Sequence, residues 1–129
     1  MSADARDIFS TGDHRLSMRE ANGWVVTTIR DSAGHIVHAA RIALSELLPS
    51  VKTLESRLEA LGDAQGRPID VFLGFKPEGD HLCAAVTADE ISIMEVSADG
   101  VARRLLCGPY PVKQAHAMAQ AVIQAGAGR

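Results

Sequence analysis

One pattern constrains the fold more than any other: short β-type segments separated by turns occur twice along the chain, each time ahead of a helical segment. Residues 12–34 and 79–100 both begin with Gly-Asp-His and end on a turn that closes with glycine. Two short apolar runs lie inside each copy. We interpret the two stretches as a pattern-level repeat, in which each copy supplies an antiparallel meander to the sheet.

The turns define the strands on either side of them. Asn22-Gly23 is the strongest hairpin signal in the chain, because a type I′ turn needs positive φ at both central residues. The predicted strands cover residues 7–10, 14–20, 24–30 and 35–42 in the first half, and 69–75, 81–87, 91–96 and 101–107 in the second. Residues 108–111 (Gly-Pro-Tyr-Pro) are predicted to break the chain and to place Pro111 at the first helical position.

The predicted fold is α+β, with three or four antiparallel strands followed by a helix, twice (β-β-β-β-α twice). The halves cover residues 7–62 and 69–126, and a short link, 63–68, joins them within a single domain of residues 1–129. This length suffices for one hydrophobic core. The pattern leaves open whether the two halves form one sheet or two.

An apolar stripe marks the first helix, predicted over residues 44–62. Its members repeat at helical spacing: Leu47, Val51, Leu54, Leu58 and Leu61. Two interpretations are open. The stripe packs on the chain's own sheet, or it pairs with the same helix of a second copy in a homodimer.

Composition and charge limit the partners and the cellular compartment that we expect for the protein. The net charge is −3, so no overall positive field draws the chain to phosphate or to an anionic membrane. We expect a cytoplasmic protein without membrane contact, because no apolar run approaches the length of a span and the first residues have no signal-peptide pattern. Cys83 and Cys107 are predicted to be free, small hydrophobic residues on strands.

Arginines gather in the predicted strands of the first half. Arg15 and Arg19 share one strand face, Arg30 ends the partner strand, and Arg41 lies on the third. In hairpin order these four residues form one basic face that can follow a nucleic-acid backbone. The alternative is that they are the solvated side of a half-covered antiparallel sheet.

Catalytic and metal sites have weaker signals. Asp13-His14 and Asp80-His81 invite a proton-transfer or metal role for His14 and His81, but neighbouring residues on a strand point to opposite faces. Turn chemistry explains both motifs without a function. The sequence contains no phosphate-binding glycine loop and no nucleophile elbow, and we predict no catalytic residue, no metal and no cofactor.

The order of elements resembles that of the PUR and Whirly single-stranded nucleic-acid binders. The resemblance implies curved sheets, helices at the seam, and binding on basic faces studded with aromatic side chains. This chain differs in its acidic net charge and in its few sheet aromatics, Phe9, Trp24, Phe72 and Phe75. In length, charge and α+β content it is also similar to small acidic dimeric secretion chaperones.

The sequence therefore leads to three functional expectations. The first is a non-catalytic protein-interaction module, adaptor or chaperone-like, that acts as a homodimer or on another protein. The second is a single-stranded nucleic-acid-binding protein that uses the basic sheet face. The third is a small enzyme or metal protein that uses His14 and His81.

Overall fold

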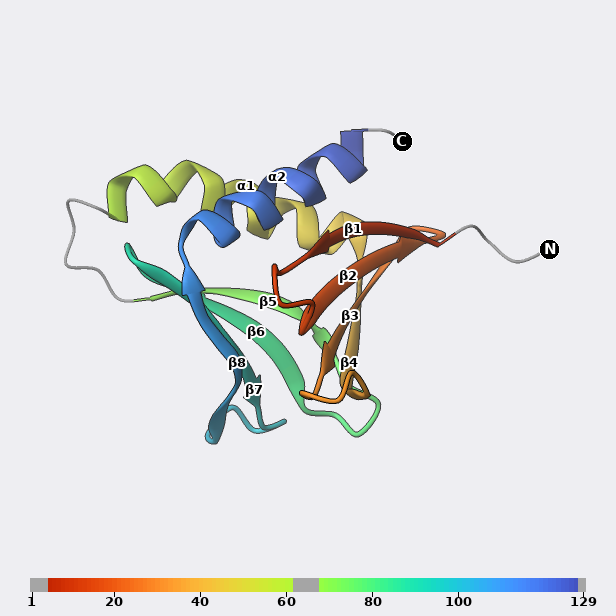
Figure 1. Cartoon of the computed structure of the whole chain (residues 1–129). Helices are drawn as coiled ribbons and strands as arrows, with labels where there is room; N and C mark the ends of the chain where they lie inside the picture. The colour runs from red at the N-terminus through yellow and green to blue at the C-terminus, as the bar shows by residue number, and fades with distance from the viewer. Residues whose placement is uncertain (1–4, 62–67, 128–129) are drawn as a thin grey trace.

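The computed structural model describes residues 5–61 and 68–127. Eight strands and two helices follow one another along the chain (Figure 1). Their bounds are β1 Arg6–Ser10, β2 Leu16–Ala21, β3 Trp24–Arg30, β4 Ile36–Ala43, α1 Leu44–Leu61, β5 Ile69–Phe75, β6 His81–Val86, β7 Glu90–Val96, β8 Arg103–Pro111 and α2 Lys113–Ala127. The predicted link, 63–68, lies outside the described residues except for Pro68.

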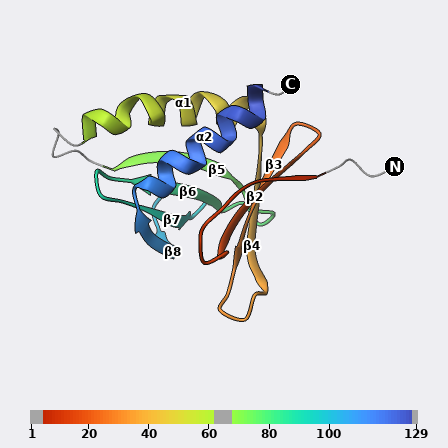
Figure 2. The same ribbon diagram turned by 45° about the horizontal axis from the view of Figure 1, so that its top comes forward.

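All eight strands belong to one antiparallel sheet, in which they lie in chain order from β1 to β8. The α+β class is therefore confirmed, and the two halves form a single sheet. Both helices lie together on one side of it (Figures 1 and 2). Below the helices, β1–β4 and β6–β8 turn away from each other, so the sheet is strongly bent (Figure 1).

Alternation along the strands separates an inner face, which meets the helices, from an outer face. On β3, Val25, Thr27 and Ile29 are fully buried, whereas Trp24 and Val26, which alternate with them, are exposed. This is the period of two expected for a sheet with one covered face. The inner faces of both halves contribute to the same core cluster, together with α1 and α2.

The apolar stripe of α1 faces that core. Leu47, Val51 and Leu54 are completely buried and Leu58 nearly so, while the side chain of Leu61 lies outside the described residues. The helix therefore packs on its own sheet, which was one of the two interpretations. Since the chain itself covers the four described side chains, they offer no exposed surface to a second copy.

The end of the sheet differs from the prediction. Residues 108–111 do not break the chain: β8 runs on to Pro111, and α2 begins at Lys113. The reason is the position of β8 at the edge of the sheet, where a proline that lacks an N–H removes no ladder hydrogen bond. The register between β7 and β8 shifts at Ile91 and Ile93, and these irregularities accommodate residues 108–111, which the sequence predicted to be a turn.

The two halves of the sheet meet at a narrow junction. Strands β4 and β5 share a single bridge, between Arg41 and Phe75, whereas β3 and β4 are matched at seven positions and β5 and β6 at six. Gly74 lies beside this bridge with a φ of +131°, and a Cβ there would clash with the backbone of Arg41. The bend of the sheet thus occurs where the ladder is shortest.

Candidate functional site

The outer face of β2–β4 presents a regular grid of side chains. In register across the three strands, Val26 of β3 lies between Arg19 and Arg41. Thr28, two residues along β3, pairs with Ser17 on one side and Ala39 on the other. Next to Trp24 the neighbours are also small, Ala21 and Ala43. Small residues therefore leave room around the few large ones.

Three of the four predicted arginines project from this grid. Arg19 and Arg41 are exposed and Arg30 is half-buried. The Arg19 Nε lies 3.0 Å from an Asp7 carboxylate oxygen at the surface, and an Arg30 Nη donates to the Ser17 hydroxyl at 3.3 Å. Arg15 lies just before β2, where its Nε donates to the Arg30 carbonyl oxygen at 2.9 Å. Arg15 thus lies beside Arg30, and Arg19 and Arg41 lie on either side of Val26 further along β3.

The charged side chains that β2–β4 place on the outer face are all basic. Strands β3 and β4 contain no acidic residue, and the single carboxylate of β2, that of Glu20, is buried on the inner face. There it accepts a hydrogen bond from the Arg6 guanidinium at 2.7 Å. The outer face of β2–β4 is thus basic in a chain whose net charge is −3.

A groove begins where this basic surface meets the junction of the two halves. The Arg41 guanidinium carbon lies 4.7 Å from the centre of the Trp24 ring, which is a cation–π distance. Trp24 is 43% exposed, and Phe75, bridged to Arg41 across the junction, is 60% exposed. We call the hollow here, of about 580 Å³, the Trp24 groove; it is lined by Trp24, Val26, Ala39, Ala40, Arg41, Phe75, Lys76 and Pro77.

Aromatic side chains continue from the Trp24 groove onto the second half of the sheet. The ring of Phe72 lies 5.0 Å from that of Phe75 and 5.2 Å from that of His81, centre to centre. These separations are typical of packed aromatic pairs. The outer face therefore carries an aromatic strip across the junction, flanked on the first half by arginines.

A cluster of charged side chains lies between the two halves. The Lys76 ammonium group is buried, contacts the Glu95 carboxylate, and lies 2.8 Å from Glu78 and 3.0 Å from the Nδ1 of His38. Arg104 lies 2.6 Å from the other oxygen of Glu95. The hydrogen bond from Lys76 is the largest influence on Glu95 and lowers its pKa, whereas burial and the charge of Lys76 lower the pKa of His38.

The cluster joins β4, the β5–β6 turn, β7 and β8. The pKa of Lys76 is raised, because its hydrogen bonds to Glu78 and Glu95 outweigh the effect of burial. Each charge is thus matched by a partner of opposite sign, which is the arrangement of a structural ion-pair network. His38 is the member of the cluster that comes from the first half, so its contact with Lys76 links the two halves, and Lys76 also lines the Trp24 groove.

His14 and His81 are not brought together. His14 lies in the β1–β2 turn with a φ of 59°, and His81 begins β6, so that β3, β4 and β5 lie between them. The Asp13 carboxylate accepts one hydrogen bond from Thr11 within the turn and another from Tyr110 of β8, so it ties the turn to the last strand. Among residues 5–61 and 68–127, no group of three metal-binding side chains converges.

The two cysteines lie on strands, as predicted. Cys83 of β6 and Cys107 of β8 are both buried and free. Burial is the largest influence on both thiols and raises their pKa values, which keeps them protonated and unreactive at neutral pH. They belong to the packing of the sheet.

Trp24 and Phe75 were recognised in the sequence as sheet aromatics but were not assigned to a site. The alternation in 24–30 indicates that Trp24 and Val26 share a face, since the two are separated by one residue. Nothing local connects Phe75 to that face, because the bridge to Arg41 joins different halves of the chain.

The comparisons add no relative. No protein-family model, no curated protein and no solved structure matches this chain. In the part of the chain that the structure describes, no helix has the length and apolar character needed to cross a membrane.

Proposed function

We propose that the chain binds single-stranded nucleic acid on the outer face of β2–β4. One observation carries the proposal: Arg19, Arg30 and Arg41 project from three adjacent strands that themselves carry no carboxylate on the outer face, although the chain as a whole is acidic. Asp7, on the neighbouring strand β1, pairs with Arg19 at the surface. A local basic surface of this kind attracts a polyanion by releasing its counterions. Exposed aromatic rings beside it supply the stacking that single strands use.

The spacing of the arginines supports an extended ligand. Arg19 and Arg41 lie two strands apart, or about 10 Å at the usual separation of strands. Arg30 lies four residues along β3 from Val26, a further 14 Å or so. Three charges spread over such a distance match successive groups of a linear polyanion better than a single small anion.

The element order supports the same function. Four strands and a helix occur twice, in the order found in the PUR and Whirly nucleic-acid binders. We therefore also propose that the two halves are repeats of one unit, that their topology is that of these binders, and that the sheet is the binding element. It also places the protein in the cytoplasm, where two free thiols are normal.

The decisive experiment is a titration of a labelled single-stranded oligonucleotide, followed by fluorescence anisotropy at low and at near-physiological salt. We expect saturable binding that weakens as salt rises. Replacement of Arg19 or Arg41 by alanine should reduce the slope of log affinity against log salt by about 1 for each arginine. Arg57→Ala, an exposed arginine of α1, is the matched control. An absence of binding at low salt would overturn the proposal.

A homodimeric protein-interaction module, adaptor or chaperone-like, is the second candidate. It is favoured by large apolar side chains that the sheet leaves exposed, among them Ile36, Val37 and Leu105. Exposed apolar groups of this size mark protein contacts when they are contiguous. Light scattering tests it. For a dimer through the exposed apolar side chains, Phe75 among them, we expect twice the chain mass of 13.7 kDa, and the mass of one chain after Phe75→Asp. A single-chain mass at every concentration would contradict it.

A further inference from the structure

The lining of the Trp24 groove is more apolar than a phosphate-binding site requires. Most of its lining is apolar, from Trp24, Val26, Ala39, Phe75 and Pro77. Its volume of about 580 Å³ lies within the range of small-molecule sites. Phosphate groups gain little from such walls, whereas a flat aromatic group gains both burial and stacking. The groove and the arginines therefore suit two different parts of one ligand.

Arg41 belongs both to the Trp24 groove and to the group of arginines. Its planar guanidinium lies over the Trp24 ring, with its carbon 4.7 Å from the ring centre. It thus covers the face of the indole that a flat ligand would stack upon. The side chain is exposed and no carboxylate is within ion-pair distance of it among the described residues, so little holds it in that position apart from the ring.

We propose that the Trp24 groove receives one unpaired nucleobase and that Arg41 leaves the indole face to contact the adjoining phosphate. This inference rests on the proposed function and names the part of the ligand that each side chain takes. The base stacks on Trp24 and reaches Phe75 across the junction. Arg41 and Arg19, which lie on either side of Val26, then both contact the sugar–phosphate backbone of the nucleic acid.

Charge complementarity favours a nucleic acid over an apolar protein segment as the occupant. Arg41 lines the groove, and Arg19, which is paired with Asp7, lies beyond Val26. Lys76 also lines the groove but is matched by Glu78 and Glu95, so the charge of Arg41 is the one available to an anion there, and β3 and β4 carry no acidic residue to oppose it. The arrangement also selects single strands. In a duplex the bases are already paired and stacked, so a base enters the groove only when it has no partner.

The test compares an oligonucleotide of about eight thymidines with the same sugar–phosphate backbone lacking every base. We expect the intact oligonucleotide to bind roughly 5- to 150-fold more tightly, the range that one stacked base supplies. Trp24 is the sole tryptophan, so its fluorescence reports the groove directly. It should be quenched by the intact strand and unchanged by the abasic one.

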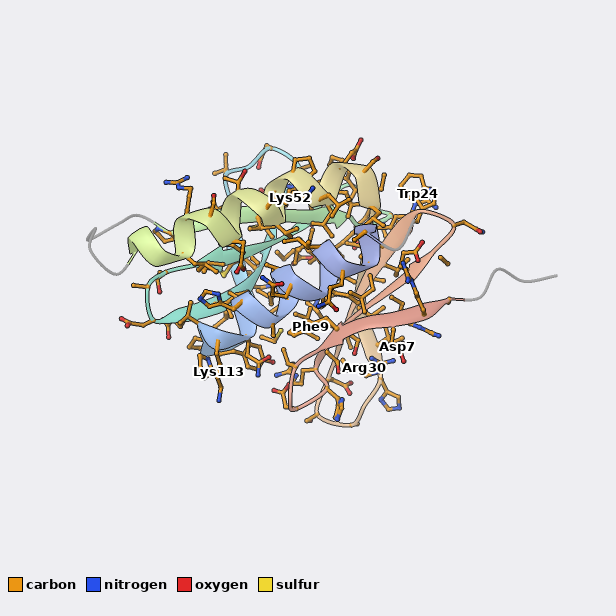
Figure 3. All side chains as sticks on the ribbon, turned by 90° about the horizontal axis from the view of Figure 1, so that it is seen from above. Asp7, Phe9, Trp24, Arg30, Lys52 and Lys113 are labelled. Atoms are coloured by element: carbon orange, nitrogen blue, oxygen red, sulfur yellow. The ribbon has the colours of Figure 1, made fainter. Side chains whose placement is uncertain are left out.

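Variants assign the effect to the groove. Trp24→Ala should abolish the preference for the intact strand and leave the affinity for the abasic strand unchanged. Lys52→Ala, on the exposed side of α1, is the control and should change neither the preference nor the affinity for the abasic strand (Figure 3). Arg41→Gln should keep the quenching of Trp24 but lower the salt slope by about 1. Because Trp24 is an exposed residue, we expect Trp24→Ala to remain folded, and the quenching experiment needs no variant.

The outcomes separate the two proposals. Equal, salt-dependent affinity for both strands, without quenching, would overturn the base-binding groove and leave the arginine surface standing. Loss of all binding at low salt would overturn both. Quenching that follows protein concentration without any oligonucleotide would show that a second copy fills the groove, and would also overturn the inference.

Discussion

Gly74 of β5 lies so close to the backbone of Arg41 of β4 that no side chain fits between them. A Cβ on Gly74 would come within 3.0 Å of three Arg41 backbone atoms. Its φ of +131° is a conformation that other residues rarely adopt. The bridge between Arg41 and Phe75, and with it the joining of the two halves of the sheet, depends on this glycine.

Gly74→Ala should therefore be strongly destabilising. Backbone strain alone costs about 1–3 kcal/mol, and the clash with Arg41 adds to it. Gly34→Ala is the matched control, since Gly34 also has positive φ (+90°) but has no atom within 4 Å of the added Cβ. Urea unfolding of both variants checks this. Equal losses of unfolding free energy would mean that the close approach has no energetic importance.

Breaking the charged cluster should cost more than breaking a surface ion pair. Glu95→Gln leaves the buried Lys76 ammonium without its principal partner, and we expect a loss of about 3 kcal/mol. Arg103→Ala removes an ion pair with Asp70 in which both side chains are over 40% exposed, and should cost at most about 1 kcal/mol. A Glu95→Gln variant as stable as the wild type would show that the ion pairs of the cluster contribute little to stability.

The same cluster predicts lower stability in acid. The folded pKa of His38 lies below the ordinary value of 6.5, so the unfolded chain takes up this proton first, and stability falls once the pH drops below about 6.5. The lowered pKa of Glu95 extends the loss below about 4.5, because its stabilising charge disappears as the pH falls through the folded value. Urea midpoints at pH 7.5 and pH 5.5 measure the first step.

Two variants identify the group responsible. His38→Gln should reduce the drop between pH 7.5 and pH 5.5, since an amide at this position does not titrate. His35→Gln, in the exposed β3–β4 turn, should leave the drop unchanged. An undiminished drop in His38→Gln would assign the acid sensitivity to another group.

The α1 stripe should determine stability without changing the mass in solution. Leu54 is completely buried, and Leu54→Ala should cost about 2–5 kcal/mol through lost contacts and the cavity left behind. Thr53→Ala, on the exposed side of the same helix, is the control. Calorimetry and light scattering test both statements. A mass that halves in Leu54→Ala while the melting temperature stays constant would instead place the stripe in a dimer contact.

Local chemistry was sufficient to predict most strands. Residues 24–30 and 69–75 are strands with the predicted bounds, because β-branched or aromatic residues lie between unambiguous turns such as Asn22-Gly23. It failed at 108–111, where two prolines and a glycine resemble a turn but lie on an edge strand. Edge position is a property of the whole sheet and is invisible in a window of ten residues.

The site was predictable only in part. The grouping of Arg15, Arg19, Arg30 and Arg41 follows from hairpin register, which sequence patterns indicate well. The Trp24 groove does not, because it requires Phe75 from the other half of the chain. The charged cluster was missed for a similar reason: Lys76 precedes Pro-Glu-Gly and resembles a solvated turn residue until the fold brings Glu95 beside it.

The order of strands in the sheet has a kinetic consequence. Because β1 to β8 lie in chain order, each strand pairs only with its neighbours in sequence, and every hairpin can form as soon as it is synthesised. The contacts that connect the two ends of the chain must await its last two elements: Tyr110 of β8 donates to Asp13, and Arg6 donates to the Ala125 carbonyl oxygen of α2. The first strand therefore remains uncovered on the ribosome until translation is nearly complete.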